Sequence, residues 1–334
     1  MSKPRRKQVY LRAYLAPFAK VLARGDVTDI YVNRPHEIWA ETTGGAIERF
    51  ESAELDEAML ERLSRQIASL AHQGISREHP LLSATLPDGA RVQVIAPPAT
   101  RGGVAIAIRK HVSPNLRLVD YASAGAFADT QTRATAATNA DKEIDRALVS
   151  GDIATALATA VRARKNILVA GGTSTGKTTF LNALIAEIAT DERLIFIEDT
   201  PELQIQHANA VGLLAARSEL GEARVSANDL VAASLRMRPD RIILGELRGD
   251  EALAFLRAVN TGHPGSMTTV HADSPKGAIE QITLLALQSG TQLSRGDVHH
   301  YVRSTIDFYV QLGRSGGRRY VSQVVRGSAL GEAG

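Results

Sequence analysis

Two hydrophobic periods occur between residues 25 and 112, and together they predict a small domain that mixes strands with one helix. Apolar or alternating runs at 29–32, 37–41, 91–95 and 104–108 are typical of strands. Residues 55–71 instead repeat apolar side chains every three or four positions, which predicts an amphipathic helix. Turn sequences at 43–45 and 87–89 separate the strands. We therefore expect an α+β domain over residues 25–118.

The second half of the chain alternates strand-like and helix-like runs, as a parallel nucleotide-binding sheet does. Strands are predicted at 166–170, 193–197, 241–245 and 266–270, helices at 141–164, 179–188, 226–237 and 250–260, and a closing hairpin at 305–312 and 319–325 around Gly316-Gly317. The expected fold class is α/β, with a C-terminal domain over residues 143–334 and the smaller α+β domain before it.

Two segments lie outside these domains. Residues 119–142 are rich in Ala, Thr, Ser and Asn, which predicts a linker. Residues 1–24 hold seven basic side chains and no acid, and a helix there would place Leu11, Leu15, Phe18 and Leu22 on one face. Such a basic amphipathic segment suits an anionic lipid surface or an acidic protein, or it caps the first domain.

Composition narrows the class of protein. The 334 residues carry a net charge of +3 and contain no cysteine, which excludes disulfides, thiolate zinc sites and thiol nucleophiles. There is no apolar run of about 18 residues and no signal-peptide pattern, so we expect a cytoplasmic protein.

A phosphate-binding motif, Gly-x-x-x-x-Gly-Lys-Thr, occupies residues 171–178, between a predicted strand and a predicted helix. Its glycines let successive N–H groups converge on phosphate oxygens, and the helix that follows adds its positive end. Lys177 is expected to neutralise the β- and γ-phosphates, and the Thr178 hydroxyl to bind Mg²⁺. The motif predicts ATP and Mg²⁺ as cofactors. The residues predicted to bind nucleotide are Gly172, Thr173, Ser174, Thr175, Gly176, Lys177, Thr178 and Thr179.

Reactive side chains follow three predicted strands of this half: Glu198, Glu246 and His271. Ligands of doubly wound sheets bind outside the carboxyl ends of the strands, so these residues are candidates for catalysis. A charged residue at one strand end is weak evidence, because such groups are commonly solvated. Their joint placement around one phosphate loop is stronger evidence.

The segments that contain these residues resemble a known family. Residues 198–202 look like its acidic Asp box, residues 238–249 its atypical Walker B segment, and residues 262–272 its His box. With the phosphate loop, they are similar to the secretion-ATPase superfamily that powers type II and type IV secretion and pilus machines. The resemblance implies a RecA-like phosphate-loop ATPase domain in a homohexamer. It implies work with other machine subunits on the cytosolic face of the inner membrane.

The absence of cysteine and the sequence of the His box indicate which branch of the superfamily the chain resembles. Type II assembly ATPases usually carry a four-cysteine zinc module, which this chain lacks. The His box and the sequence at 278–282 look most like the traffic ATPases of type IV secretion and conjugation. The tight-adherence pilus ATPases share much of these sequences, whereas retraction ATPases end their His box differently. A tight-adherence or type IV pilus ATPase and a type II secretion motor remain alternatives. A DNA translocase is less favoured, because the chain has one Trp and offers no aromatic stacking platform; nucleic acid as a partner stays open.

Roles within the site follow from phosphoryl transfer, which depends on positioning and charge neutralisation. Glu198 is assigned to the attacking water and Glu246 to the Mg²⁺ network through water, with the exchanged assignment kept open. Gly245 stands where many Walker B strands have aspartate. His271 is expected to sense the γ-phosphate, whereas His263 is as readily structural.

Arginines form a separate set of candidates. Arg91 and Arg109 lie in segments similar to the phosphate-reaching motifs of the type IV branch. Without the resemblance they read equally well as surface arginines. With it, the first domain would supply them to the phosphates and swing during hydrolysis. One of Arg236, Arg238 and Arg248 is a candidate finger between subunits.

Overall fold

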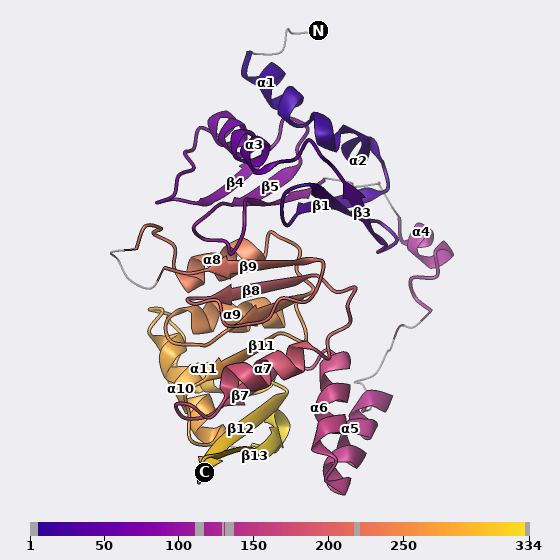
Figure 1. Ribbon diagram of the computed structural model, residues 1–334. Helices are drawn as coiled ribbons and strands as arrows, with labels where there is room; N and C mark the ends of the chain where they lie inside the picture. The colour runs from indigo at the N-terminus through magenta and orange to yellow at the C-terminus, as the bar shows by residue number, and fades with distance from the viewer. Residues whose placement is uncertain (1–5, 111–116, 129, 131–136, 217–220, 331–334) are drawn as a thin grey trace.

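The computed structural model describes residues 6–110, 117–128, 130, 137–216 and 221–330. These residues form two sheets, one above the other in Figure 1, with helices around each. The fold is mixed α/β, as predicted. Below, residues 6–110 are called the N-terminal unit and residues 137–330 the C-terminal unit.

The N-terminal unit is built on a six-stranded antiparallel sheet in the order β3-β2-β1-β6-β5-β4. Its strands are β1 (Val27–Val32), β2 (Glu37–Thr42), β3 (Ile47–Glu51), β4 (Leu81–Thr85), β5 (Arg91–Ile95) and β6 (Ala105–Arg109). Helix α3 (Glu57–Leu70) packs its buried face, Leu60, Leu63 and Ile67, on this sheet. The two strands that the hydrophobic pattern misses, β3 and β4, are partly exposed and partly polar, as expected for the edges of a sheet.

The amino-terminal segment packs on the same core. Helices α1 (Arg6–Tyr14) and α2 (Ala19–Ala23), joined by the short 3₁₀ helix η1 (Ala16–Phe18), bury Leu11, Phe18 and Val21 against the sheet and α3. The apolar face therefore covers the N-terminal unit, which is the capping alternative. Residues 1–5 of the predicted basic segment lie outside the described residues.

The C-terminal unit is built on a seven-stranded sheet in the order β13-β12-β7-β11-β10-β8-β9, parallel except for the β12–β13 hairpin. Its strands are β7 (Ile167–Ala170), β8 (Leu194–Glu198), β9 (Ala210–Leu214), β10 (Arg241–Leu244), β11 (Met267–Val270), β12 (Phe308–Ser315) and β13 (Arg318–Arg326). The hairpin turns at Gly316 and Gly317, whose φ values of 56° and 81° suit the tight turn that the sequence predicts.

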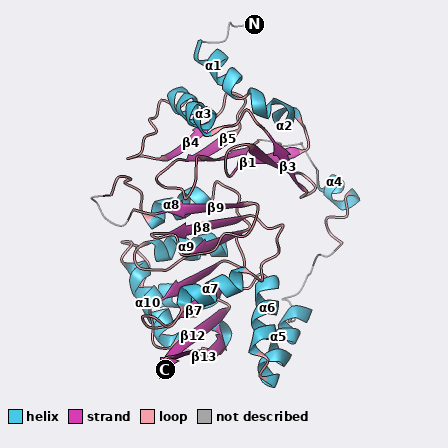
Figure 2. Ribbon diagram, in the orientation of Figure 1, coloured by secondary structure: helices cyan, strands magenta, loops and turns pink. Residues whose placement is uncertain are grey.

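Helices cover both faces of this sheet (Figure 2). They are α5 (Asn139–Ser150), α6 (Ile153–Arg162), α7 (Lys177–Ile185), α8 (Ala227–Ser234), α9 (Glu251–Asn260), α10 (Pro275–Leu287) and α11 (Arg295–Thr305), with the 3₁₀ helix η2 (Gly327–Ala329) near the end. The single helix predicted over 141–164 is wrong: it is two helices, because Gly151 at φ 79° ends α5 with a left-handed cap.

A short helix, α4 (Leu118–Ser123), begins one residue before the predicted linker and buries no residue. In Figure 1 it lies to one side of both sheets. Residues 129 and 131–136 of the predicted linker lie outside the described part of the chain. None of the helices in the described ranges is both long enough and apolar enough to cross a bilayer.

One of the three hydrophobic clusters of the described residues spans both units. Tyr31, Trp39 and Ile95 of the N-terminal sheet cluster with Val211 and Leu213 of strand β9 and with the buried residues around them. Arg193 is fully buried at this boundary, stacks on Tyr31 at 3.9 Å and donates to the Asn33 side chain at 2.6 Å. A swing of one unit on the other within a chain would expose this core, which opposes the hinge predicted from the resemblance.

Candidate active site

Four neighbouring strands bring the predicted catalytic groups to one edge of the sheet. β7, β11, β10 and β8 are adjacent and parallel, so the phosphate loop, His271, Glu246 and Glu198 follow strands that end on the same side. Together they line a pocket of about 380 Å³. The remaining lining residues are Thr173, Ser174, Thr175, Gly176, Lys177, Thr178, Thr179, Asp199, Thr200, Glu202, Gly245, Arg248, Thr269 and Arg319. Every residue of the predicted nucleotide-binding set except Gly172 lines it.

The phosphate loop has the backbone that its glycine and small residues predict. Gly176 is left-handed at φ 94° and is the N-cap of α7, which begins at Lys177. Ser174 is also left-handed, at φ 60°, and the Thr175 hydroxyl donates to the Gly172 carbonyl at 2.9 Å. These conformations turn the loop around the N-terminus of a helix, where unpaired N–H groups attract anions.

Lys177 lies at the centre of the pocket. Its ammonium donates to the Gly171 carbonyl at 3.1 Å, and it lies 3.3 Å from the His271 ring and 3.6 Å from Glu246 Oε1. Burial lowers the pKa of Lys177 below its ordinary value, and the nearby Glu246 carboxylate partly opposes this. A buried, incompletely neutralised cation of this kind favours a phosphate group beside it.

The two acids have different surroundings. Glu246 Oε1 lies 3.0 Å from His271 Nε2, and Glu246 Oε2 accepts from Arg248 Nε at 2.5 Å. Glu198 is more deeply buried: its Oε1 accepts from the backbone N–H groups of Glu202 at 3.0 Å and Leu203 at 2.8 Å, and its Oε2 pairs with Arg101.

The Asp box also contacts the expected Mg²⁺ ligand. The Thr178 hydroxyl donates to Glu202 Oε2 at 3.0 Å, at the first turn of α7. Asp199 pairs with Arg248. Thr178, Glu202 and Glu246 offer oxygen donors beside the phosphate loop, and Mg²⁺ in such sites takes few protein ligands together with phosphates and water. The donor set therefore fits the predicted metal.

Arg91 and Arg109 lie elsewhere within the chain. They line a second pocket, of about 610 Å³, with Gln93 and Arg236, and Arg109 Nε donates to Asp29 at 2.8 Å. The intrachain approach to the phosphates expected from the resemblance is therefore not seen, because the N-terminal sheet packs on β8 and β9 rather than over the phosphate loop. Their contact with phosphate remains a prediction.

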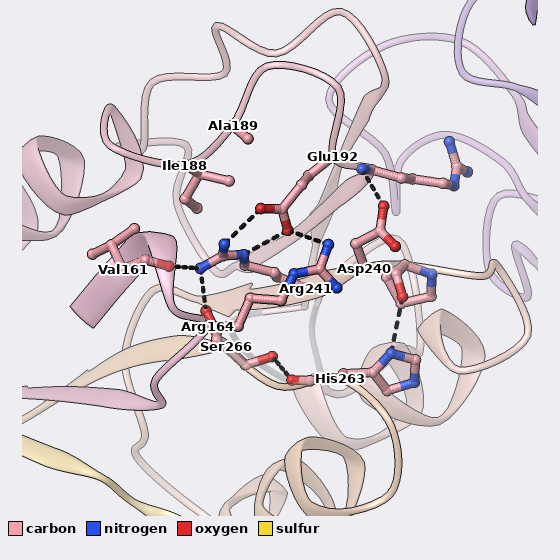
Figure 3. A network of polar contacts seen from close by, with 12 residues as sticks. Val161, Arg164, Ile188, Ala189, Glu192, Asp240, Arg241, His263 and Ser266 are labelled. Atoms are coloured by element: carbon pink, nitrogen blue, oxygen red, sulfur yellow. Dashed lines mark hydrogen bonds and ion pairs between the residues drawn. The ribbon is translucent and has the colours of Figure 1, made fainter. Parts of the chain in front are cut away.

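The other candidates fall into two groups. Arg248 lines the nucleotide pocket, whereas Arg238 bridges Glu41 of the N-terminal unit and Asp240. His263, labelled in Figure 3, does not line the pocket, and its Nδ1 lies 2.9 Å from the Pro239 carbonyl, which favours the structural alternative.

Two basic residues near the site carry no motif signal. Arg319, on β13, lines the pocket and donates to the Ser174 carbonyl at 3.1 Å. Arg101 reaches Glu198 from the N-terminal unit. Both are far from the motifs in sequence, so only the fold brings them to the site.

A buried ion pair fixes the opposite ends of the catalytic strands. Arg241, the first residue of β10, donates to both Glu192 oxygens, at 2.6 and 2.7 Å, and to the Val161 carbonyl at 2.8 Å. Figure 3 shows this fork with Arg164 as a second partner of Glu192, at 3.2 Å. The pair links β10 to the segment before β8, so it holds in register the two strands that lead to Glu246 and Glu198.

A phosphate loop after one parallel strand, with acids and an imidazole after its neighbours, defines a phosphate-loop nucleoside triphosphatase. Comparison with known proteins identifies the family of triphosphatases to which the chain belongs. The model of the family "Type II/IV secretion system protein" matches residues 13–300. The chain belongs to this family, and it is an ATPase of type IV secretion.

Individual relatives agree with this assignment. The type IV secretion system protein VirB11 of Bartonella henselae is 38% identical over 93% of this chain and 91% of that protein. The type IV secretion system protein PtlH of Bordetella pertussis is 39% identical over 91% of this chain and 90% of that protein. The crystal structure of the VirB11 ATPase from the Brucella suis type IV secretion system, in complex with sulphate, has a TM-score of 0.90 at 34% identity and covers 97% of this chain and 96% of that one. The predicted family and its type IV branch are confirmed.

Proposed function

We propose that this ATPase acts as a homohexamer that hydrolyses ATP with Mg²⁺ and drives substrate translocation or assembly of a type IV secretion machine. It works beside other subunits on the cytosolic face of the inner membrane. The observation that carries the catalytic part is the convergence of Lys177, Glu246 and His271 within 3.6 Å at the phosphate loop. The chain divides into a basic segment (1–24), an α+β domain (25–118), a linker (119–142) and a RecA-like domain (143–334).

Each residue has a distinct role in this proposal. Lys177 neutralises the β- and γ-phosphates, Thr178 holds Mg²⁺, and His271 contacts the γ-phosphate. In this proposal Glu246 takes both roles, rather than exchanging one with Glu198. Glu246 faces Lys177 and His271, so it orients the attacking water as well as the Mg²⁺ shell. Both oxygens of Glu198 are already held, by backbone N–H groups of Glu202 and Leu203 and by Arg101.

The proposed ring assigns Arg91 and Arg109 to a neighbouring subunit. Both lie in the pocket away from their own phosphate loop, so they reach phosphates only if that pocket faces the nucleotide of another copy. Mixed assembly tests this: Arg91→Ala subunits combined with Lys177→Ala subunits recover activity at shared sites only if Arg91 acts between chains.

The decisive test of the nucleotide site is Lys177→Ala. Phosphate release from ATP should be abolished while the circular dichroism spectrum and unfolding midpoint stay close to those of the wild type. Light scattering with and without ATP and Mg²⁺ tests the ring, which should have six times the 35.8 kDa monomer mass. Undiminished turnover by Lys177→Ala would refute the site, and a monomer under every condition would refute the ring.

The membrane part needs a gentler test than deletion, because residues 11–21 contribute to the core. Arg12 and Lys20 are exposed, so the double substitution Arg12→Glu, Lys20→Glu reverses charge without touching that core. Loss of co-sedimentation with anionic vesicles at low salt would support lipid contact through this segment. Equal binding of variant and wild type would refute it.

A further inference from the structure

The segment between β5 and β6 leaves the N-terminal sheet and runs along β9, the edge strand of the C-terminal sheet. Thr100 forms an antiparallel bridge with Leu213. The Arg101 N–H donates to the Gly212 carbonyl at 2.9 Å, and the Leu214 N–H donates to the Ala99 carbonyl at 2.9 Å. A short antiparallel bridge thus joins the N-terminal unit to the sheet that carries the nucleotide site, and it fixes the register of Arg101 on that sheet.

The Arg101 side chain continues from this bridge into the Asp box. One guanidinium nitrogen, Nη1, donates to the Leu203 carbonyl at 2.7 Å, and the other, Nη2, pairs with Glu198 Oε2. The Glu198 side chain is 3% exposed and that of Arg101 19%. Among the described residues, no other basic side chain forms an ion pair with Glu198, so its buried charge is balanced from the N-terminal unit.

A glycine makes room for this path. A Cβ on Gly212 would lie 2.6 Å from Arg101 Cδ and 2.9 Å from Arg101 Cγ. Glycine in the middle of a strand weakens it unless another chain segment approaches closely, and here that segment is the stem of Arg101. The close approach to Gly212 and the ion pair with Glu198 are two independent observations that fix where the Arg101 side chain lies.

Glu198 and Glu202 connect Arg101 to Thr178, the expected Mg²⁺ ligand. Arg101 holds Glu198, and Glu198 accepts the N–H groups of Glu202 and Leu203. Glu202 in turn accepts the hydroxyl of Thr178, the expected Mg²⁺ ligand. Displacement of Arg101 therefore releases the carboxylate that fixes the segment beside Thr178, while the phosphate loop itself is untouched.

We infer that Arg101 is a positioning residue through which docking of the N-terminal unit on β9 organises the Asp box for hydrolysis. The inference rests on the proposed function, because it concerns the same nucleotide site. ATP turnover then requires the docked arrangement, and a chain whose N-terminal unit leaves the β9 edge binds nucleotide but hydrolyses it slowly.

The test uses the full-length chain with ATP and Mg²⁺. Arg101→Met should lower kcat by about tenfold to a hundredfold, the usual effect of misplacing a catalytic group. The KM for ATP and the affinity for a fluorescent nucleotide analogue should stay within threefold. Arg101→Lys keeps the charge and should recover part of kcat. The matched control is Arg77→Met, which breaks another ion pair between the units, with Glu222; both residues are exposed and neither lines the nucleotide pocket.

A double-mutant cycle shows whether Arg101 acts through Glu198. The four proteins are the wild type, Arg101→Met, Glu198→Gln and the double variant, followed under single-turnover conditions so that slow hydrolysis is measurable. If the inference holds, Arg101→Met has no further effect in the Glu198→Gln background. The same cycle in equilibrium unfolding should show a matching coupling, because Arg101→Met alone leaves a buried carboxylate unpaired.

Several results would overturn the inference: kcat of Arg101→Met within twofold of wild type, effects of the two substitutions that multiply, or an equal loss in Arg77→Met. The proposed function fails separately, if the wild type does not hydrolyse ATP or if Lys177→Ala does. If the wild type does not hydrolyse ATP, the double-mutant cycle in equilibrium unfolding still tests the inference. Independent contributions of Arg101 and Glu198 to the free energy of unfolding would show that the contact on which the inference depends is absent.

Discussion

Removing Arg241 alone should cost more stability than removing Arg241 and Glu192 together. Arg241 is fully buried, and its guanidinium is held by both Glu192 oxygens and by the Val161 carbonyl (Figure 3). Arg241→Met leaves the Glu192 carboxylate, itself 6% exposed, with Arg164 as its remaining partner at 3.2 Å. Breaking a buried pair on one side costs about 3–5 kcal/mol, and the residual Arg164 contact places this case near 3 kcal/mol.

The double variant Arg241→Met, Glu192→Met removes both charges and fills the space with apolar atoms. Replacing a buried pair in this way is often neutral, but the Val161 carbonyl also loses its donor, which costs about 1–3 kcal/mol. We expect the double variant to lie within about 2 kcal/mol of the wild type. Glu192→Met alone should be the least stable of the three, because it strands a fully buried guanidinium.

The assay is equilibrium unfolding in urea, followed by circular dichroism and by Trp39 fluorescence to test whether the two units unfold together. Nucleotide affinity of the folded variants is the internal control. Arg241 begins β10 and Leu244 ends it on the side of the site, three residues further on and roughly 10 Å away at 3.3 Å per residue, so affinity should not change. A loss below 1 kcal/mol in Arg241→Met, or additive single losses in the double variant, would refute the reasoning.

Two further predictions concern the same region. Burial lowers the pKa of His263 below 6.5, so as pH falls the unfolded chain takes up the proton before the folded chain does. The free energy of unfolding should therefore decrease as pH drops below 6.5. His263→Gln should reduce this pH dependence in urea titrations at pH 7.5 to 5.5. Gly265→Ala should lower stability by about 2–4 kcal/mol, because Gly265 is left-handed at φ 82° and a Cβ there would lie 2.9 Å from Arg164 Cα. The control is Gly290, which is also left-handed but has open space where a Cβ would lie, so Gly290→Ala should cost only about 1 kcal/mol. Equal losses in the two variants would contradict the steric argument.

Sequence reasoning found the phosphate loop and the groups after β8, β10 and β11 because parallel strands that alternate with helices end on one side of a sheet. It missed β9, since a five-residue run with Gly212 at its centre has weak strand propensity. It also missed α10 and α11, and Arg101 and Arg319 at the site. Those arginines act through tertiary packing, which periodicity does not encode.

β9 and Arg101, which sequence reasoning missed, belong to the same contact between the two units. β9 is an edge strand, and an open edge invites pairing with other chains. The opposite edge of the same sheet, β13, carries Arg318, Arg319 and Arg326 and needs no cover. β9 has no charged residue and is covered instead by Ala99 to Arg101 of the N-terminal unit. A segment that must cover this edge to keep the protein soluble also brings a guanidinium to Glu198. Protection of the sheet and organisation of the Asp box are therefore a single contact, so variants that weaken docking at β9 should slow hydrolysis and promote aggregation together.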